Sequence, residues 1–340
     1  MITLATQILL PGPVDAAGLQ VTHRELPAPA DGQAMIAVEA SGVSFAEQQM
    51  RRAKYYDQPP FPFVPGYDLV GTVTAIGPGV DPALLGRRVA ALTKVGGWSS
   101  HIVLAAADLV PVPDGLDPAA AETFVVNGIT AWRMLHRIAK VRAGQTILVH
   151  GANGGVGSTL VQLARHAGIR VIGTASARHA EAVAALGAEP IDYRGDVVAQ
   201  VRALAPEGVD AVFDHVGGPG IVDSFGLLAP HGTLVSYGTA VTKNDPGNSR
   251  LPVLALVGRL IWWNLLPNKR NAHFFNIWAG KRDRTRFRAA IAADLGAVFE
   301  LAAAGSLRAQ VAARIPLAEA ARAMELAESG TVTGKVVLVS

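Results

Sequence analysis

A glycine-rich segment, TILVHGANGGVG at residues 146–157, combines residue types and spacing that could hold a nucleotide. Its glycines at 151, 154 and 157 follow a strand-like run and open a helix-like run. Small residues let the backbone turn tightly beside a pyrophosphate, and the first helical turn offers unpaired N–H groups to the phosphates. Ala152 replaces the usual second glycine, so a structural turn of another α/β protein is the alternative. In its strand–loop–helix context the segment predicts dinucleotide binding.

The next strand-like run, with GTASARHAE at residues 173–181, indicates which dinucleotide is bound. NAD-binding domains place an Asp or Glu at this strand's end to accept a hydrogen bond from the ribose 2′-hydroxyl. Here the first carboxylate is Glu181, which we expect inside the following helix. Ser176 and Arg178 precede it, and both can donate to a phosphate. The pattern favours NADPH, although Arg178 could also be an ordinary solvated arginine of a first helical turn.

The remaining residues show no pattern typical of a metal site or of a catalytic nucleophile. The chain has no cysteine, which excludes disulfides and cysteine-ligated zinc. Its nine histidines show no metal-ligand spacing, and we find no convincing Ser-His-Asp or Ser-Tyr-Lys arrangement. We therefore expect no metal site.

Composition limits the classes of partner. Half of the 340 residues are hydrophobic, 17% are charged, and the formal net charge is +3. No basic stripe is interleaved with aromatics, so nucleic acid is not an expected partner. The N-terminus lacks a basic segment followed by a long apolar run, which favours a cytoplasmic protein. The apolar stretch 251–266 carries Arg259 and is followed by Pro267, so we expect a helix that is buried or partly exposed rather than a membrane span.

Two patterns of elements must position these residues. Short apolar runs separated by Gly and Pro turns over the first 110 residues predict an irregular, barrel-like β domain. Asp117 and Pro118 predict the start of a helix that runs to about Lys140, interrupted at Asn127–Gly128. After Gly144, strand-like runs alternate with helices of about a dozen residues, which predicts an α/β domain with a parallel sheet.

The last sixty residues predict a helix near 285–304, a strand near 310–314, a helix at 317–328 and a final strand, KVVLV, at 335–339. We expect this final strand to return to the first domain. The expected organisation is therefore a first domain in two parts, residues 1–121 and 281–340, with the nucleotide domain, residues 122–280, inserted between them.

Nearly the whole chain resembles the medium-chain dehydrogenase/reductase superfamily, in its zinc-free quinone-oxidoreductase (zeta-crystallin-like) group. The segments that carry the resemblance are 40–80, 127–132 (NGITAW), 144–193, 214–218 (DHVGG), 232–238 (GTLVSYG) and 333–339 (TGKVVLV). Residues 250–285 are most similar to the vesicle amine transport protein branch. The resemblance implies an α/β Rossmann domain with a doubly wound parallel sheet, a GroES-like β-barrel catalytic domain, and NADPH in the cleft.

The resemblance also nominates residues. It places Thr130 near the nicotinamide, and Tyr55 where a cleft-lining tyrosine could donate to a carbonyl oxygen or simply pack. Tyr193 could equally be a surface tyrosine. The residues that the resemblance assigns to the rest of the cofactor are Asn153, Gly154, Gly155, Val156, Ser176, Arg178, Tyr193, Val216, Gly238, Thr239, Phe275 and Lys335.

Two departures from the family matter. Zinc-containing members have a Gly-His-Glu motif where this chain has Gly66, Tyr67 and Asp68, and they have an early cysteine ligand that this chain lacks. Many quinone-type members have Asn where this chain has Ser44, whose hydroxyl can still form a hydrogen bond. Without zinc to polarise an oxygen, the suited acceptor is already electron-poor. We therefore expect an enzyme that transfers hydride from NADPH to a quinone or a carbonyl-conjugated alkene, both small hydrophobic substrates.

Two other classes of function stay open. One is an NADPH-binding protein that acts by interaction at a membrane surface, and the other is a nucleic-acid-binding protein. We also expect a homodimer formed through an edge strand at 272–278 (AHFFNIW), since an open aromatic edge invites pairing.

Trp262 and Trp263 are adjacent, so on a helix they point about 100° apart and cannot share one narrow buried stripe. We expect at least one of them to be partly exposed, in a segment that forms an apolar lid or wall for bulky acceptors. Packing of both indoles on a partner or a neighbouring domain is the alternative.

Overall fold

The structure, a computed structural model, describes residues 2–240 and 250–340 and divides the chain into two units. One unit combines Met1–Ile129 with Gly280–Ser340, and the other is Thr130–Ala279. The second unit is thus inserted into the first. The boundaries between the units lie at 129/130 and 279/280, whereas the sequence predicts them at 121/122 and 280/281. The first junction lies further along the chain than expected because it falls inside a continuous helix.

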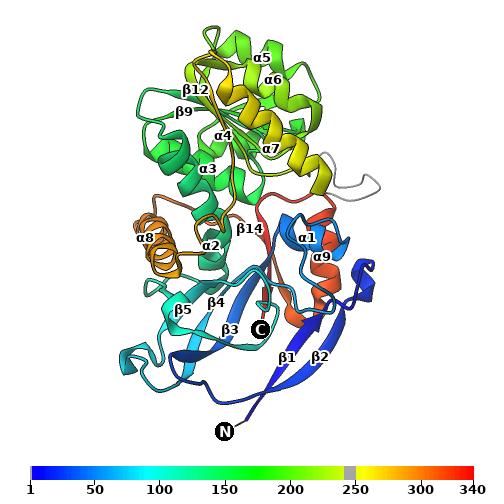
Figure 1. Ribbon diagram of the computed structural model, residues 1–340, viewed down its shortest axis with the longest axis vertical. Helices are drawn as coiled ribbons and strands as arrows, with labels where there is room; N and C mark the ends of the chain where they lie inside the picture. The colour runs from blue at the N-terminus through cyan, green and yellow to red at the C-terminus, as the bar shows by residue number, and fades with distance from the viewer. Residues whose placement is uncertain (1, 241–249) are drawn as a thin grey trace. The chain divides into compact units, whose positions relative to one another are not determined.

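The inserted unit is built on one six-stranded sheet in which every adjacent pair of strands is parallel. The strand order is β10-β9-β8-β11-β12-β13, so the chain reverses direction across the sheet beside β8. Figure 1 shows this sheet with helices on both of its faces. This is the doubly wound α/β arrangement that the family resemblance implies. The strands are β8 (Thr146–Val149), β9 (Arg170–Ala175), β10 (Glu189–Asp192), β11 (Val209–Asp214), β12 (Leu228–Ser236) and β13 (Asn271–Phe274).

Strand sequences in this sheet are apolar because both faces are covered. Leu148, Ile172, Val212 and Leu234, from four strands of the sheet, are fully buried in one cluster. The α-helices that cover the sheet are α3 (Gly155–His166), α4 (Ala180–Leu186), α5 (Val197–Leu204), α6 (Ile221–Gly226) and α7 (Arg250–Leu265).

The other unit contains a mostly antiparallel seven-stranded sheet and a two-stranded sheet. The last strand, β15, pairs antiparallel with β3 and parallel with β14, which brings the end of the chain back to its first part. Its strands are β1 (Thr3–Leu9), β2 (Gln20–Leu26), β3 (Gln33–Val43), β4 (Asp68–Ile76), β5 (Arg88–Leu92), β6 (His101–Ala105), β7 (Val110–Pro111), β14 (Val311–Pro316) and β15 (Lys335–Val339). Its α-helices are α1 (Phe45–Arg51), α8 (Arg284–Ala303), α9 (Ala320–Glu328) and most of α2 (Pro118–Trp132).

Helix α2 corrects one expectation. The Asp117 carboxylate accepts from the Ala120 amide at 2.9 Å, as its capping position predicts. The expected interruption at Asn127–Gly128 is wrong, because α2 is continuous and passes into a π-helical segment, Arg133–Ala139. A Cβ atom at Gly128 would lie 2.8 Å from Val298 Cγ1 in α8. The glycine therefore permits close helix packing rather than a break.

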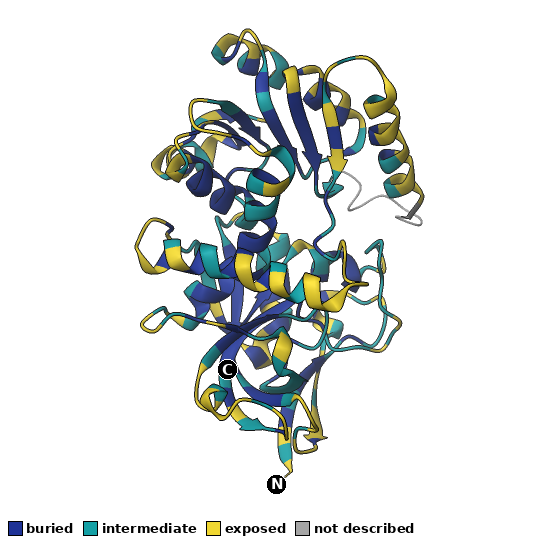
Figure 2. Ribbon diagram, turned by 60° about the vertical axis from the view of Figure 1, so that its left-hand side comes forward, coloured by how far each residue is buried: buried dark blue, intermediate teal, exposed yellow. Residues whose placement is uncertain are grey.

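The segment 251–266 forms helix α7 as expected, ending at Leu265. Trp263 stacks on Phe225 with ring centroids 4.2 Å apart, whereas Trp262 is 59% exposed, so the two indoles do point different ways. Figure 2 shows α7, the helix beside the grey segment, coloured mainly as exposed. Across residues 2–240 and 250–340, no helix is long and apolar enough to cross a membrane.

Strand β13 lies at the edge of the parallel sheet, where the sequence predicts an edge strand, but it ends at Phe274 rather than at 278. The chain turns beyond it because Asn276 accepts from the Trp278 amide through its side chain and from the Ala279 amide through its carbonyl. The apolar edge is therefore shorter than the sequence suggests.

Candidate functional site

Nearly all the predicted cofactor residues of the inserted unit follow the carboxyl ends of its parallel strands. Because these ends share one edge of the sheet, the fold brings residues from distant parts of the sequence together. They are Asn153, Gly154, Gly155 and Val156 after β8, Ser176 and Arg178 after β9, Tyr193 after β10, Val216 after β11, Gly238 and Thr239 after β12, and Phe275 after β13. Thr130 is the exception, since it is buried within α2.

The turn between β8 and α3 has the geometry that its glycines allow. Gly151 has a positive φ of 65°, and its carbonyl accepts from the Gly154 amide at 3.0 Å. A Cβ atom at position 157 would lie 2.2 Å from the Gly151 carbonyl oxygen, so a side chain there would displace the turn. Gly154 caps α3 without a side chain, which leaves space beside the helix start. This turn fits a pyrophosphate.

The end of β9 fits the 2′-phosphate of NADPH better than a free ribose hydroxyl. Ser176 is buried, and its hydroxyl oxygen has no hydrogen-bond partner among the residues that the structure describes. Arg178 lies two residues further, in a short 3-10 turn, and no carboxylate stands between β9 and Glu181. Tyr193, in contrast, is 53% exposed.

The turns after β11 and β12 lie against each other. The His215 carbonyl accepts from the Ala240 amide at 3.0 Å, and a Cβ atom at Gly238 would lie 2.7 Å from that same carbonyl oxygen. Phe275 continues the edge, with its amide donating to the Ser236 carbonyl at 2.8 Å. Val216, Gly238 and Phe275 thus occupy neighbouring turns.

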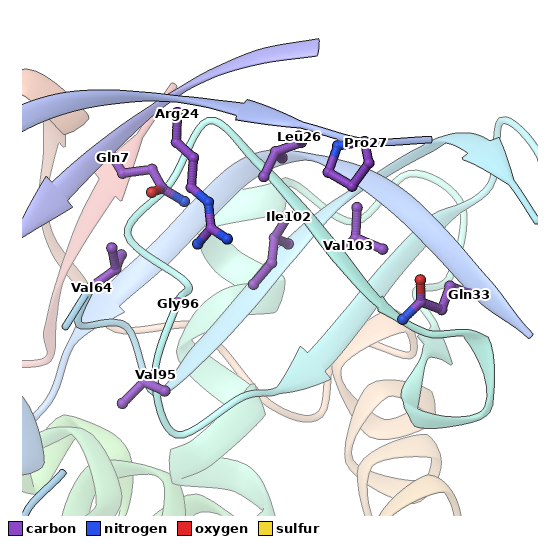
Figure 3. A pocket seen from close by; sticks show the side chains of 10 residues that line it. All are labelled: Gln7, Arg24, Leu26, Pro27, Gln33, Val64, Val95, Gly96, Ile102 and Val103. Carbon is purple, nitrogen blue, oxygen red and sulfur yellow. The ribbon is translucent and has the colours of Figure 1, made fainter. Parts of the chain in front are cut away.

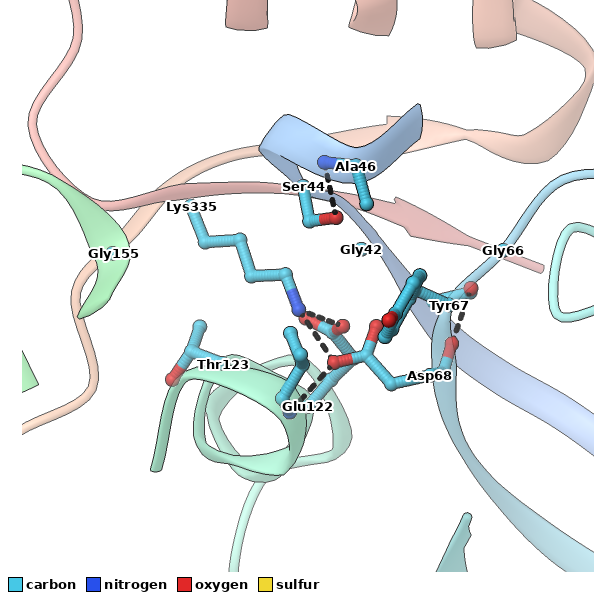
Figure 4. A network of polar contacts seen from close by, with 12 residues as sticks. Gly42, Ser44, Ala46, Gly66, Tyr67, Asp68, Glu122, Thr123, Gly155 and Lys335 are labelled. Atoms are coloured by element: carbon cyan, nitrogen blue, oxygen red, sulfur yellow. Dashed lines mark hydrogen bonds and ion pairs between the residues drawn. The ribbon is translucent and has the colours of Figure 1, made fainter. Parts of the chain in front are cut away.

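Lys335, expected at the cofactor, makes a buried ion-pair cluster within the first unit. Its Nζ lies 2.7 Å from Asp68 Oδ2 and 2.6 Å from Glu122 Oε1, and the three side chains are at most 3% exposed (Figure 4). A Cβ atom at Gly42 would collide with the Lys335 side chain, so glycine makes room for it. The structure shows a structural role for this ammonium group, and its role toward a cofactor stays a prediction.

Burial and neighbouring charges shift the pKa values of Glu122 and Lys335 in this cluster. Burial raises the pKa of Glu122 well above 4.5, and the Asp68 carboxylate raises it further. Burial alone would lower the pKa of Lys335, but the two carboxylates raise it overall. One ammonium, one carboxylate and one protonated acid would leave the cluster neutral, the arrangement that buried charges require.

Ser44 and Tyr55 belong to a second polar network in the same unit. Ser44 caps α1 and bonds Glu47, whose buried carboxylate also accepts from the Tyr67 amide at 2.6 Å. The Tyr55 and Tyr67 hydroxyls lie 2.9 Å apart. Burial raises the pKa of Tyr55 far above its usual value, and neighbouring Tyr67 adds to the shift. Tyr55 therefore keeps its proton and can donate a hydrogen bond.

The donor set does not fit zinc at the Gly66-Tyr67-Asp68 segment. Asp68 Oδ2 is already bonded to Lys335 and to the Val126 amide, and the Ser44 hydroxyl is bonded to Glu47. Among the residues that the structure describes, no three His, Cys, Asp or Glu side chains gather closely enough to hold a metal ion. The hydrogen bonds already made by Asp68 and Ser44 thus leave no free zinc-ligand set at this segment.

Sequence reasoning missed Glu122, Glu47, and the buried polar residues beneath the glycine turn. Asp68 and Tyr67 belong to a motif that the sequence does single out, but their partners Lys335 and Tyr55 are 267 and 12 positions away. No local pattern could identify those partners.

A separate cavity of about 420 Å³ lies in the first unit, and Figure 3 shows the Arg24 side chain directed into it. None of the predicted site residues lines it. The lining residues are Gln7, Arg24, Leu26, Pro27, Gln33, Val64, Val95, Gly96, Ile102 and Val103.

Two family descriptions match this chain. Residues 30–114 match the alcohol dehydrogenase GroES-like domain, and residues 186–338 match the zinc-binding dehydrogenase domain. The human synaptic vesicle membrane protein VAT-1 homolog is 35% identical over 256 residues, which cover 74% of this chain and 64% of that protein. The chain thus spans a little under two thirds of that relative's length.

Solved structures of other proteins match this chain over nearly its full length. A quinone oxidoreductase from Pseudomonas syringae is 27% identical, with a TM-score of 0.83 over 99% of this chain and 100% of the other. A mycobacterial protein solved in complex with NADPH is 28% identical, with a TM-score of 0.83 over 98% of this chain and 100% of that one. The two-unit architecture is therefore shared with oxidoreductases.

Proposed function

We propose that this chain, which belongs to the medium-chain dehydrogenase/reductase superfamily, is a zinc-independent reductase that transfers hydride from NADPH to a quinone or a carbonyl-conjugated alkene. The observation that carries the proposal is the end of β9. There the buried Ser176 hydroxyl, unpartnered within the described chain, and the nearby Arg178 replace the acidic residue of NAD-binding domains. A phosphate would satisfy that hydroxyl.

When bound, NADPH supplies the hydride, and the protein supplies binding, orientation and exclusion of water. The turns after β8, β9, β11 and β12 would hold the pyrophosphate, the adenosine phosphate and the nicotinamide ribose. In the overall reaction a quinone takes up one hydride and one proton and becomes a hydroquinone. An electron-poor acceptor of this kind reacts without a Lewis acid.

The Tyr55 hydroxyl is the group we assign to the acceptor's carbonyl oxygen. Its raised pKa keeps it protonated, and the Tyr67 hydroxyl at 2.9 Å can orient it. Ser44 would act indirectly, because its hydroxyl is bonded to Glu47, which in turn holds the Tyr67 backbone. Tyr55→Phe should therefore lower turnover while leaving NADPH binding unchanged.

An acceptor screen tests the proposal. Protein treated with a chelator is mixed with NADPH and, in turn, quinones, enals, enones and simple ketones. We expect oxidation of NADPH with the conjugated acceptors and little with simple ketones. Turnover that is lost with chelation and restored by zinc would contradict the proposal, as would turnover of simple ketones alone.

A second candidate function rests on helix α7. Five of its large apolar side chains are more than half exposed, and their spacing places them along one side of the helix: Leu251, Leu254, Ile261, Trp262 and Leu265. Such a stripe could lie in a membrane interface, and the human relative is named as a vesicle membrane protein. Flotation of the protein with liposomes, lost when Trp262 and Leu265 are both changed to Ser, would support this function.

A further inference from the structure

Four polar side chains form a connected group beneath the glycine turn of the inserted unit. Thr174 stands in β9, His150 follows β8, Asp214 ends β11, and Ser224 lies in α6. Thr174, Asp214 and Ser224 are at most 3% exposed. None of them is among the residues proposed above to contact NADPH or substrate.

The direction of each hydrogen bond can be deduced, starting from Asp214. Its Oδ1 accepts from the Val216 amide at 2.7 Å and the Gly217 amide at 2.9 Å, and its Oδ2 lies 2.7 Å from the Ser224 hydroxyl. A carboxylate can only accept, so the single hydroxyl hydrogen of Ser224 is committed to Asp214.

This commitment fixes the tautomer of His150. Nε2 lies 3.0 Å from the Ser224 oxygen, which has no second hydrogen to give, so Nε2 must carry the ring proton. Burial favours the neutral ring, since it lowers the pKa of His150, and Nδ1 is then an acceptor. It faces the Thr174 hydroxyl at 3.5 Å, the longest link, and the same Thr174 oxygen accepts from the Gly151 amide at 3.0 Å.

Every link therefore points one way, from the Gly151 amide through Thr174, His150 and Ser224 to Asp214. The two ends of this chain are backbone turns. Gly151 begins the glycine turn, and Val216 and Gly217 form the turn after β11, which pairs directly with β8. Gly151 and Gly217 both have positive φ, 65° and 68°. Glycine adopts positive and negative φ about equally readily, so the backbone preference of these residues does not by itself fix either turn.

We propose that Thr174, His150, Ser224 and Asp214 are positioning residues that hold the glycine turn and the turn after β11 in a fixed relation, through a neutral His150 protonated on Nε2. This inference rests on the proposed function in that the ligand held by the two turns is NADPH. The tautomer itself is a property of the protein without cofactor.

The first test measures the tautomer directly. Long-range ¹⁵N–¹H NMR spectra of the cofactor-free protein distinguish the two ring nitrogens, and the spectrum of His150→Gln assigns the signals. We expect Nε2 protonated and Nδ1 unprotonated at neutral pH, with Ser224→Ala shifting the population towards the other form. Protonation on Nδ1 in the unmodified protein would overturn the inference.

The second test measures how strongly NADPH binding depends on the hydrogen-bond chain that connects the two turns. Thr174→Val and Ser224→Ala should each raise the Kd for NADPH by about five- to thirtyfold, as expected for loss of one buried hydrogen bond. Thr233→Val is the matched control, because Thr233 is a buried threonine of β12 outside the group. The Kd of the Thr233→Val variant for NADPH should be unchanged.

The double variant separates positioning from two independent losses. If one chain connects both turns, Thr174→Val and Ser224→Ala together should raise the Kd by clearly less than the product of their separate effects. Effects that multiply, or single variants that bind NADPH normally, would refute the inference while leaving the proposed function intact. Absence of NADPH binding by the unmodified protein would instead refute the proposed function, and the tautomer measurement would still stand.

Discussion

At the scale of the residue, selectivity between the two dinucleotides depends on the side chains just beyond β9. Ser176 offers a buried hydroxyl, and Arg178 offers a guanidinium that can pair with a phosphate. Neither group would gain as much from a ribose hydroxyl. The proposed preference for NADPH therefore reduces to two side chains in one turn.

Arg178→Ala should weaken NADPH binding and leave NADH binding nearly unchanged. Loss of a charge-assisted contact costs about 1.5–3 kcal/mol, which corresponds to roughly a ten- to hundredfold rise in Kd. Fluorescence titration with each cofactor measures both values. Arg202→Ala, on the exposed side of α5, is the control. Equal weakening for both cofactors would show that Arg178 does not contact the 2′-phosphate.

Glu122 makes stability depend on pH. Its pKa is raised in the folded protein from an ordinary 4.5, so the folded state retains the proton longer than the unfolded chain. The resulting stabilisation is fully present below pH 4.5 and is lost as the pH rises towards the raised pKa. Glu122→Gln keeps the neutral form at every pH. Urea unfolding at about pH 5 and about pH 8 should therefore show a smaller alkaline loss of stability for this variant.

Lys335→Met removes the positive charge from the same buried cluster. It leaves the remaining buried carboxylate without its cation, and an unpaired buried charge typically costs about 3–5 kcal/mol. A variant that is instead as stable as the unmodified protein but binds NADPH weakly would favour the cofactor role that the family resemblance implies for Lys335.

At the scale of the element, the sequence predicted types and order better than boundaries. The strands β8 to β12 and their helices were predictable because apolar runs alternate with glycine-ended helices, and Gly168 and Gly187 both adopt positive φ where those helices end. Gly128 misled the prediction because its lack of a side chain serves contact with Val298, which lies 170 positions further along. Local sequence does not distinguish a glycine that breaks a helix from one that lets two helices approach.

Helix α7 offers a matched pair of substitutions. Trp263→Ala should destabilise the protein by about 3 kcal/mol, because it removes the indole stacked on Phe225. Trp262→Ala should change stability by less than about 0.5 kcal/mol, because that indole is 59% exposed. Thermal or urea unfolding of the two variants measures the difference. Similar losses for the two variants, whether large or small, would contradict the assignment of one packed and one exposed indole.

The lid suggested for this segment has its own test on the same helix. If α7 contacts bulky acceptors, a large quinone should quench the fluorescence of Trp262, and Trp262→Ala should raise KM for large quinones more than for small ones. Equal effects on both would contradict the lid.

At the scale of the whole molecule, β13 leaves one edge of the parallel sheet without a neighbouring strand within the described chain. Pairing of two such edges about a twofold axis would extend the sheet across two copies. We expect a homodimer, and light scattering at micromolar concentration should give twice the mass of the chain. A monomer under these conditions would refute the expectation.

The polar contacts that could not be predicted share one property. Lys335 meets Asp68 and Glu122, and Ser224 meets His150, only after segments distant in sequence have come together. The glycine turn, in contrast, is encoded within a dozen residues, which is why the turn between β8 and α3 was predictable and the polar network beneath it was not.

The proposed function requires that this chain reduce electron-poor acceptors with NADPH and without a metal. The most direct measurement is kcat/KM with a single 1,4-quinone, determined for NADPH and for NADH on protein freed of metals by chelation. We expect turnover that persists in the presence of the chelator. We also expect a kcat/KM at least roughly tenfold higher for NADPH than for NADH, as phosphate contacts at Ser176 and Arg178 require. No turnover with NADPH, equal values for the two cofactors, or activity that returns only with zinc would contradict the account.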